Sequence, residues 1–138
     1  MIEWAGKKHP NYLAAGTNHG WIQIWDATRN TGVPAKAIHT WFKGEDLGIR
    51  SISWSDDVMA VGADEGMISL VDIRTPDDGI KISQHRDSVL GLKWSPDGTF
   101  LASGDRNGLV YIWDKRATKS LVNTTPTKIR NQGSARVS

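Results

Sequence analysis

Four side chains that can exchange protons or hydrogen bonds lie within the stretch 83–115: His85, Ser103, Asn107 and Trp113. A His beside a Ser can form the catalytic pair of a hydrolase, in which the imidazole takes the hydroxyl proton, and Asp87 can complete such a triad. The same residue types can instead form a buried chain of hydrogen bonds. An indole N–H is only a donor, so a buried Trp113 needs an acceptor such as the Ser103 hydroxyl, which can then donate to His85. The residue types alone allow both interpretations.

No other catalytic or metal-binding pattern stands out. The chain has no Cys, which excludes a Cys-based zinc site and a disulfide framework. The His residues at positions 9, 19, 39 and 85 have no metal-ligand spacing. The Gly104–Gly108 turn lacks the Lys of a phosphate-binding loop. We therefore expect no metal, no cofactor and no enzymatic activity.

The charges are divided unevenly along the 138 residues. All 15 acidic residues lie at or before Asp114, together with 11 Lys and Arg residues, and the other 6 Lys and Arg residues follow. An acidic body is unsuited to nucleic acid, whose phosphates need a basic surface, so we expect no nucleic-acid partner. No apolar stretch reaches 18 residues, so we also expect no membrane span.

The chain contains internal repeats, and these must position the side chains named above. Glycines at 16, 62 and 104 align at spacings of 46 and 42 residues, and further glycines at 20, 66 and 108 keep the same spacings. Asp residues at 26, 72 and 114 follow in the same register. Trp4, Trp54 and Trp94 each end a preceding apolar run. Four-stranded repeats of about 40–45 residues are typical of propeller blades.

Each copy contains four short runs of β-branched and aromatic residues, which favour strands. The runs are 2–4, 12–16, 21–25 and 37–41 in the first copy, 49–54, 58–62, 67–73 and 80–83 in the second, and 89–94, 100–104, 109–113 and 120–123 in the third. Turn sequences such as Ser95-Pro96-Asp97-Gly98 separate them. We predict an all-β fold of three four-stranded antiparallel blades at about 1–41, 48–83 and 84–123, with a disordered basic tail at 124–138.

With Trp113-Asp114 near its end, the third copy resembles a WD40 repeat. Its His85, Ser103, Asn107 and Trp113 match the positions of the structural hydrogen-bond tetrad of that family, which usually has Asp where this chain has Asn107. The resemblance favours the hydrogen-bond chain over the hydrolytic triad, because the Trp of the tetrad accounts for the Ser. It implies a partial WD40 β-propeller.

The order of the copies is similar to the Fizzy family of anaphase-promoting-complex activators, the substrate receptors of a cell-cycle ubiquitin ligase. The most specific pieces are NYLAAGT, the VDIR that replaces a Trp-Asp pair in the second copy, and VLGLKWSPDGTFLASG. The resemblance covers residues 2–116 and corresponds to an internal stretch of about three blades. It implies a non-catalytic adaptor in the nucleus and cytoplasm whose protein partners are ubiquitin-ligase subunits and degron-bearing substrates.

The resemblance also implies that degron peptides bind on the narrow top face of the propeller, which is built from turns and loops. The residues expected there are Glu45, Asp46, Asp64, Glu65, Asp87, Asp105 and Arg106. Carboxylates suit peptide motifs that carry Lys or Arg, through charge-assisted hydrogen bonds. Trp21 and Trp41 are further candidates, either as core residues or as exposed recognition aromatics.

Two other functions remain open from the sequence: a general WD40 scaffold for protein interactions, and a truncated fragment without independent function. Three blades cannot close a ring, so the outer blades should expose faces that a closed propeller buries. Such faces indicate either a longer propeller or association of the chain with itself or with another chain.

Overall fold

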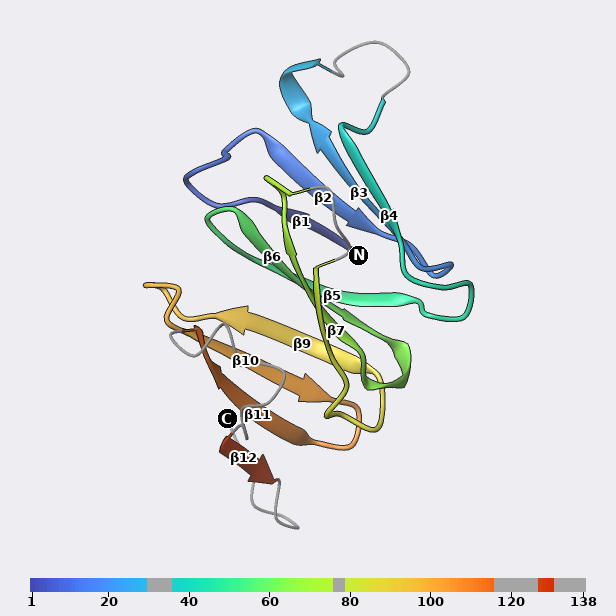
Figure 1. Cartoon of the computed structure of the whole chain (residues 1–138), viewed down its shortest axis with the longest axis vertical. Helices are drawn as coiled ribbons and strands as arrows, with labels where there is room; N and C mark the ends of the chain where they lie inside the picture. The colour runs from blue at the N-terminus through green and yellow to red at the C-terminus, as the bar shows by residue number, and fades with distance from the viewer. Residues whose placement is uncertain (30–35, 76–78, 116–126, 131–138) are drawn as a thin grey trace.

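In the computed structural model of the chain, the regular secondary structure is antiparallel β-sheet apart from two short 3-10 helices among the described residues (Figure 1). It describes residues 1–29, 36–75, 79–115 and 127–130. These residues form three four-stranded sheets, which follow one another along the longest axis of the molecule. The predicted all-β fold of three antiparallel blades is confirmed.

The strands of each blade are hydrogen-bonded in sequence order. Blade one consists of β1 (Ile2–Trp4), β2 (Tyr12–Gly16), β3 (Trp21–Asp26) and β4 (His39–Phe42). Blade two consists of β5 (Ile49–Ser55), β6 (Val58–Ala63), β7 (Ile68–Asp72) and β8 (Ile80–Ile82). Blade three consists of β9 (Val89–Trp94), β10 (Phe100–Asp105), β11 (Leu109–Asp114) and β12 (Thr127–Arg130). The short 3-10 helices η1 (Ala27–Arg29) and η2 (Asp64–Gly66) lie in the connections after β3 and after β6.

The fourth strand of blade three differs from the prediction. The strand expected at 120–123 lies outside the described residues, and β12 pairs with β11 instead. The prediction of a disordered tail is therefore wrong for residues 127–130, and the rest of 124–138 lies outside the described residues. Without β12, one side of β11 would present unpaired backbone groups, and this need for a partner strand is not visible in the composition of the tail.

The blades stack because each has an apolar face turned toward the next. We call this the stacking face. It is built from the same five repeat positions in every blade: Tyr12, Ala14, Gly16, Ile22 and Ile24 in blade one, Val58, Ala60, Gly62, Ile68 and Leu70 in blade two, and Phe100, Ala102, Gly104, Val110 and Ile112 in blade three. Successive strand residues point to opposite sides, so one strand supplies two faces.

Two apolar layers result from this stacking. Ala14, Ile22 and Ile24 of blade one pack with Ile49 and other residues of blade two. In the second layer the equivalent residues of blade two pack with Val89, Leu92, Trp94 and Leu101 of blade three. A fully buried Ile or Leu side chain contributes on the order of 2 kcal/mol, so these layers hold the blades together.

Close approach of the blades requires glycine at one position of the stacking face. A Cβ on Gly16 would lie 2.3 Å from Cγ2 of Ile49, and a Cβ on Gly62 would lie 2.8 Å from Cγ1 of Val89. Ile49 and Val89 begin the first strands of blades two and three. The repeated glycine therefore receives the first apolar residue of the following blade.

Candidate functional site

Loops from all three blades meet along one edge of the stack (Figure 1). We call this the loop edge, and it comprises residues 17–20, 43–48, 64–66, 83–88 and 105–108. Backbone hydrogen bonds tie these loops together: Ile49 N–H of blade two donates to Thr17 O of blade one at 2.9 Å, and within blade three Arg106 N–H donates to Ser88 O at 3.0 Å. All seven residues predicted to bind peptide lie on the loop edge. It is therefore the surface on which a function must be sought.

Asp64 forms a clamp between blades rather than a free ligand. Its carboxylate accepts hydrogen bonds from Arg50 Nε at 2.8 Å, from Arg50 Nη2 at 2.9 Å and from Ser88 Oγ at 2.8 Å. Arg50 Nη1 also donates to Asn18 Oδ1 at 3.4 Å, so all three blades are linked. The Arg50 hydrogen bonds are the main cause that lowers the pKa of Asp64 from 3.8 to about 2. The carboxylate is thus already satisfied by its own chain.

The side chains of blade three that we first singled out form one buried network. Trp113 Nε1 donates to Ser103 Oγ at 3.0 Å, and Ser103 Oγ lies 2.7 Å from His85 Nε2. The other imidazole nitrogen, Nδ1, lies 2.9 Å from Asp105 Oδ2. Since a carboxylate can only accept, the Nδ1–H of His85 donates to Asp105; Nε2 of the neutral imidazole is then the acceptor of the Ser103 hydroxyl proton.

The fourth member of this network is Asp105, and the prediction that it is Asn107 is wrong. The Asn107 side chain is exposed, and only its backbone N–H takes part, donating to Asp105 Oδ1 at 2.9 Å. Leu109 N–H donates to the same oxygen at 3.0 Å. Asp105 lies at the end of β10, where its buried carboxylate can reach both His85 and the turn, whereas Asn107 is at the tip of the turn.

The network has the Ser–His–Asp order of a hydrolase, with Asp105 in the place we had considered for Asp87. Its surroundings exclude that chemistry. Ser103 has no exposed surface, and its oxygen already accepts the Trp113 N–H. The side chains of His85 and Asp105 are both 0% exposed. A substrate carbonyl cannot reach the hydroxyl, so the network holds blade three together. For the same reason, the prediction that Asp105 binds peptide is wrong.

A pocket at the loop edge combines exposed aromatic rings with carboxylates. The rings of Trp21 and Phe42 lie 4.7 Å apart, and each side chain is 44% exposed. They are directly opposed on β3 and β4. Together with His19, Glu45 and Asp46 they line a pocket of about 470 Å³. Trp21 is thus a surface aromatic, whereas Trp41, the other candidate, is buried in the first apolar layer.

The remaining predicted residues do not join this pocket. Glu65 is exposed in the turn after β6, where its φ of 62° places it in the left-handed region. Asp87 is half-buried and accepts the backbone N–H of Ser88 at 2.7 Å. Arg106 is exposed in the turn between β10 and β11. Of the seven predicted residues, the structure brings together only Glu45 and Asp46, and it adds aromatic neighbours to them.

Two residues that border the loop edge, Phe42 and Arg50, were not predicted from the sequence. Phe42 could have been found from strand pairing, because it ends β4 opposite the residue that begins β3. Arg50 could not, because a β-bulge between Ile49 and Ser51 interrupts the alternation of β5 there. A bulge depends on the partner strand and leaves no clear mark in the sequence.

The opposite edge of the stack has its own ionic cluster, which the sequence also did not reveal. The buried Asp57 of blade two accepts hydrogen bonds from Lys8 Nζ and, at 2.7 Å, from His9 Nε2 of blade one. The hydrogen bond from Lys8, followed by that from His9, lowers the pKa of Asp57 to about 2. Ionic clusters at both edges therefore fix the relative orientation of the first two blades.

Metal and membrane sites are not found in the part of the chain that the structure describes. There, no group of three or more His, Cys, Asp and Glu side chains is placed to hold a metal ion. No helix among these same residues is long and apolar enough to cross a membrane.

Comparison with known proteins gives consistent matches. The family of the WD domain, G-beta repeat, matches residues 79–114. The chain is 35% identical to the B-type cell cycle switch protein ccs52A of Medicago truncatula over 88% of its own length and 24% of that protein. It is 33% identical to the anaphase-promoting complex subunit cdc20 of Dictyostelium discoideum, over 82% of its length and 21% of that protein.

Two solved structures have the same fold. A chain in the crystal structure of the Mitotic Checkpoint Complex superposes with a TM-score of 0.79 at 25% identity, covering 94% of this chain and 36% of that one. The structure of Saccharomyces cerevisiae Sqt1 gives a TM-score of 0.73 at 25% identity, covering 84% of this chain and 31% of that one.

The stacked four-stranded blades and the His–Ser–Trp network of the third blade define a partial β-propeller of the WD40 class. The chain is a WD40-repeat protein that resembles an internal stretch of the Fizzy family of anaphase-promoting-complex activators. It spans about a quarter of the length of curated relatives such as the ccs52A protein and the Arabidopsis thaliana protein FIZZY-RELATED 1.

Proposed function

We propose that the chain is a non-catalytic, degron-recognising part of an activator of the anaphase-promoting complex, and that it captures peptides at the pocket of the loop edge. Its partners in this role are ubiquitin-ligase subunits and degron-bearing substrates, and its place of action is the nucleus and cytoplasm. The similarity to cell-cycle switch and anaphase-promoting-complex proteins supports the proposal.

The observation that carries the proposal is the pairing of aromatic rings with carboxylates. Trp21 and Phe42 present flat apolar surface that can pack along the methylene stem of a Lys or Arg side chain. The ring faces attract the cationic head, and Glu45 and Asp46 lie in the same pocket to accept its hydrogen bonds. The pocket therefore suits a peptide with a basic residue, such as a destruction-box or KEN-box peptide.

Binding of a fluorescent KEN-box peptide and a destruction-box peptide, followed by anisotropy, tests this proposal. We expect the double variant Glu45→Lys/Asp46→Lys to weaken binding at least about tenfold, which corresponds to loss of one or two charge-assisted contacts. Glu65→Lys is the matched control, because it also reverses a charge on the loop edge but lies outside the pocket.

An equal loss in the Glu65→Lys variant would mean that net charge, not the pocket, attracts the peptide. A peptide in which the basic residue is replaced by Ala should bind the wild-type chain as weakly as the basic peptide binds the double variant. If neither degron peptide binds the folded wild-type chain, the proposal is wrong.

The second candidate function is a general WD40 interaction scaffold. It is favoured by the use of Asp64 and Asp105 in structural contacts, which removes two of the carboxylates expected to contact a degron. Retention of protein partners by a chain that binds neither degron peptide would support the scaffold.

A further inference from the structure

We propose that the peptide captured at the loop edge adds a strand to the free edge of β4, antiparallel to it, with its basic residue opposite Phe42. The proposal rests on the proposed function, which puts a basic side chain into the pocket of Trp21, Phe42, Glu45 and Asp46. The main chain of the peptide is then held by β4, and its basic side chain by the pocket.

The free edge of β4 is the outer side of blade one. Among the described residues, β4 pairs with β3 on one side and with no strand on the other (Figure 1). An edge strand presents N–H and C=O groups that can pair with a further strand. Because the blades stack through their faces, a further blade before or after these three would leave this edge open.

The hydrogen bonds at the end of β4 show which backbone groups point outward. Lys43 N–H donates to Gly20 O at 2.8 Å, so these two residues are a hydrogen-bonded pair. Hydrogen-bonded and non-hydrogen-bonded pairs alternate along an antiparallel ladder, so the adjacent pair of Trp21 and Phe42 is not hydrogen-bonded. The N–H and C=O of Phe42 therefore point away from β3, and so do those of Thr40, two residues earlier.

β4 is the one outer strand, among those the structure describes, that contains no Lys or Arg. β8 contains Lys81, and β12 contains Lys128 and Arg130. Charged residues, Lys above all, are what edge strands commonly carry to prevent pairing with another chain. The sequence of β4 is His-Thr-Trp-Phe, in which the last three residues favour strands. Its edge is thus suited to receive a further strand.

A strand added to β4 places a side chain on the exposed ring pair. Residues directly opposite one another on neighbouring strands have their Cβ atoms about 4.5–5.5 Å apart on the same side of the sheet. Phe42 lies opposite Trp21 in this way, with the ring centroids 4.7 Å apart. A peptide residue opposite Phe42 on its other side has the same relation to it, so a Lys or Arg there lies along the rings.

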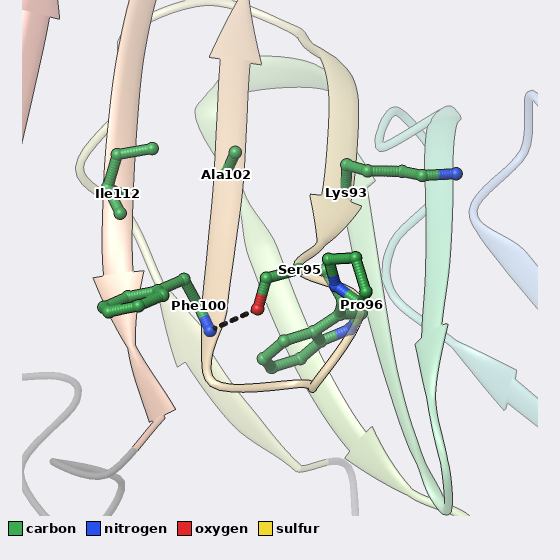
Figure 2. A pocket seen from close by; sticks show the side chains of 7 residues that line it. Lys93, Ser95, Pro96, Phe100, Ala102 and Ile112 are labelled. Carbon is green, nitrogen blue, oxygen red and sulfur yellow. Dashed lines mark hydrogen bonds between the residues drawn. The ribbon is translucent and has the colours of Figure 1, made fainter.

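Glu45 and Asp46 supply the negative charge that a basic residue requires at this end of β4. Both are exposed in the same pocket as the rings, and neither is engaged by another described residue. The pocket of about 460 Å³ on blade three lacks this combination: Figure 2 shows Phe100 and Pro96 there beside Lys93, and no carboxylate is among its lining residues. A basic residue is therefore suited to the pocket beside β4 and not to that one.

N-methylated peptides test the proposal on the wild-type chain, with binding followed by fluorescence anisotropy. The probe is the degron peptide, and the reference position is the basic residue whose replacement by Ala weakens binding. In the antiparallel strand this residue pairs with Phe42 and the residue two places after it pairs with Thr40, whereas the N–H between them points away. We expect N-methylation at either paired residue to raise the dissociation constant at least about tenfold, and N-methylation of the residue between them to change it less than about threefold.

Thr40→Pro removes an outward N–H from the protein side. Pro is tolerated on an edge strand where its nitrogen faces solvent, so the blade should stay folded, which circular dichroism checks. We expect the dissociation constant of the unmethylated peptide to rise at least about fivefold. Lys81→Pro is the matched control and should leave binding unchanged, because Lys81 opposes Ser69 in blade two as Thr40 opposes the equivalent Gln23 in blade one.

The outcomes separate the added strand from peptide capture itself. If the peptide binds but N-methylation has the same effect at all three positions, or if Thr40→Pro and Lys81→Pro bind equally well, the added strand is refuted while capture at the pocket stands. If neither degron peptide binds, both proposals are refuted. Sedimentation velocity without peptide tests for a second copy at the edge: a wild type that dimerises while Thr40→Pro stays monomeric would also overturn the proposal.

Discussion

Replacement of Asp105 should unfold blade three far more readily than replacement of Asn107. The Asp105 carboxylate is buried and accepts three hydrogen bonds, at 2.9 Å from His85 Nδ1, 2.9 Å from Asn107 N and 3.0 Å from Leu109 N. Hydrogen bonds to a charged group contribute about 1.5–3 kcal/mol each, and a buried donor left without an acceptor costs about 1–3 kcal/mol. Without the carboxylate, the backbone N–H groups of Asn107 and Leu109 in the turn can partly hydrogen-bond to water, but the buried Nδ1–H of His85 cannot. We expect Asp105→Ala to lower the free energy of unfolding by about 3–5 kcal/mol.

Two further variants sharpen this prediction. Asp105→Asn keeps one oxygen for the turn amides but can point an NH2 group at the His85 N–H, so we expect a smaller loss of about 1–3 kcal/mol. Asn107→Ala removes an exposed side chain and leaves the backbone N–H in place, so its effect should stay within about 0.5 kcal/mol. The measurement is urea unfolding followed by Trp fluorescence, with unchanged m values. If Asn107→Ala destabilises the chain as much as Asp105→Ala, the assignment of Asp105 to the network is refuted.

Two other predictions concern the contacts between blades. The pKa of Asp64 is lowered from 3.8 to about 2 in the folded chain, so between these two values the unfolded chain binds more protons than the folded chain. The contribution of Asp64 to the free energy of unfolding is therefore fully present above about pH 4 and is lost as the pH falls toward 2. Urea unfolding across this range should show a shallower pH dependence in Asp64→Asn than in the wild type; identical slopes would contradict the role of the clamp. Gly62→Ala should destabilise the chain by more than about 2 kcal/mol, because a Cβ there would lie 2.3 Å from Ser51 Oγ of the same blade and 2.8 Å from Val89 Cγ1 of the next; Gly104→Ala should be neutral or slightly stabilising, because a Cβ there meets nothing closer than 3.8 Å. Thermal unfolding of the two variants compares them directly, and equal melting temperatures would speak against the stacking geometry.

Much of the fold follows from local sequence patterns. The strands are short and hydrophobic on at least one side, and turn residues separate them, so eleven of the twelve predicted strands begin within two residues of their observed starts. The aligned glycines predicted the blades because the same close approach recurs at Gly16 and Gly62. The strand β12 contains the strand formers Thr127 and Ile129, but it escaped prediction because the surrounding stretch 124–138 has few apolar residues and the strand gains its partner only from the exposed side of β11.

The candidate site was less predictable, because its members come from loops that the sequence does not place. The resemblance to the Fizzy family put seven charged residues on the loop edge, but residue type could not tell a carboxylate that faces solvent from one that its own chain already binds. Glu45 and Asp46 are exposed, whereas Asp64 is held by Arg50 and Asp105 by His85. The partners of a charged side chain depend on distances between blades, and those distances are set by packing.

The network of His85, Ser103 and Trp113 shows the same division. The sequence by itself determined that His85, Ser103 and Trp113 belong to one repeated unit, because residue types and spacing along a single blade are local properties. Only the tertiary structure decided that Asp105 and not Asn107 completes their network, and that the Ser103 hydroxyl is closed to any substrate. Burial and the direction of a side chain at a strand end depend on how the sheets stack, and stacking is a property of the whole chain.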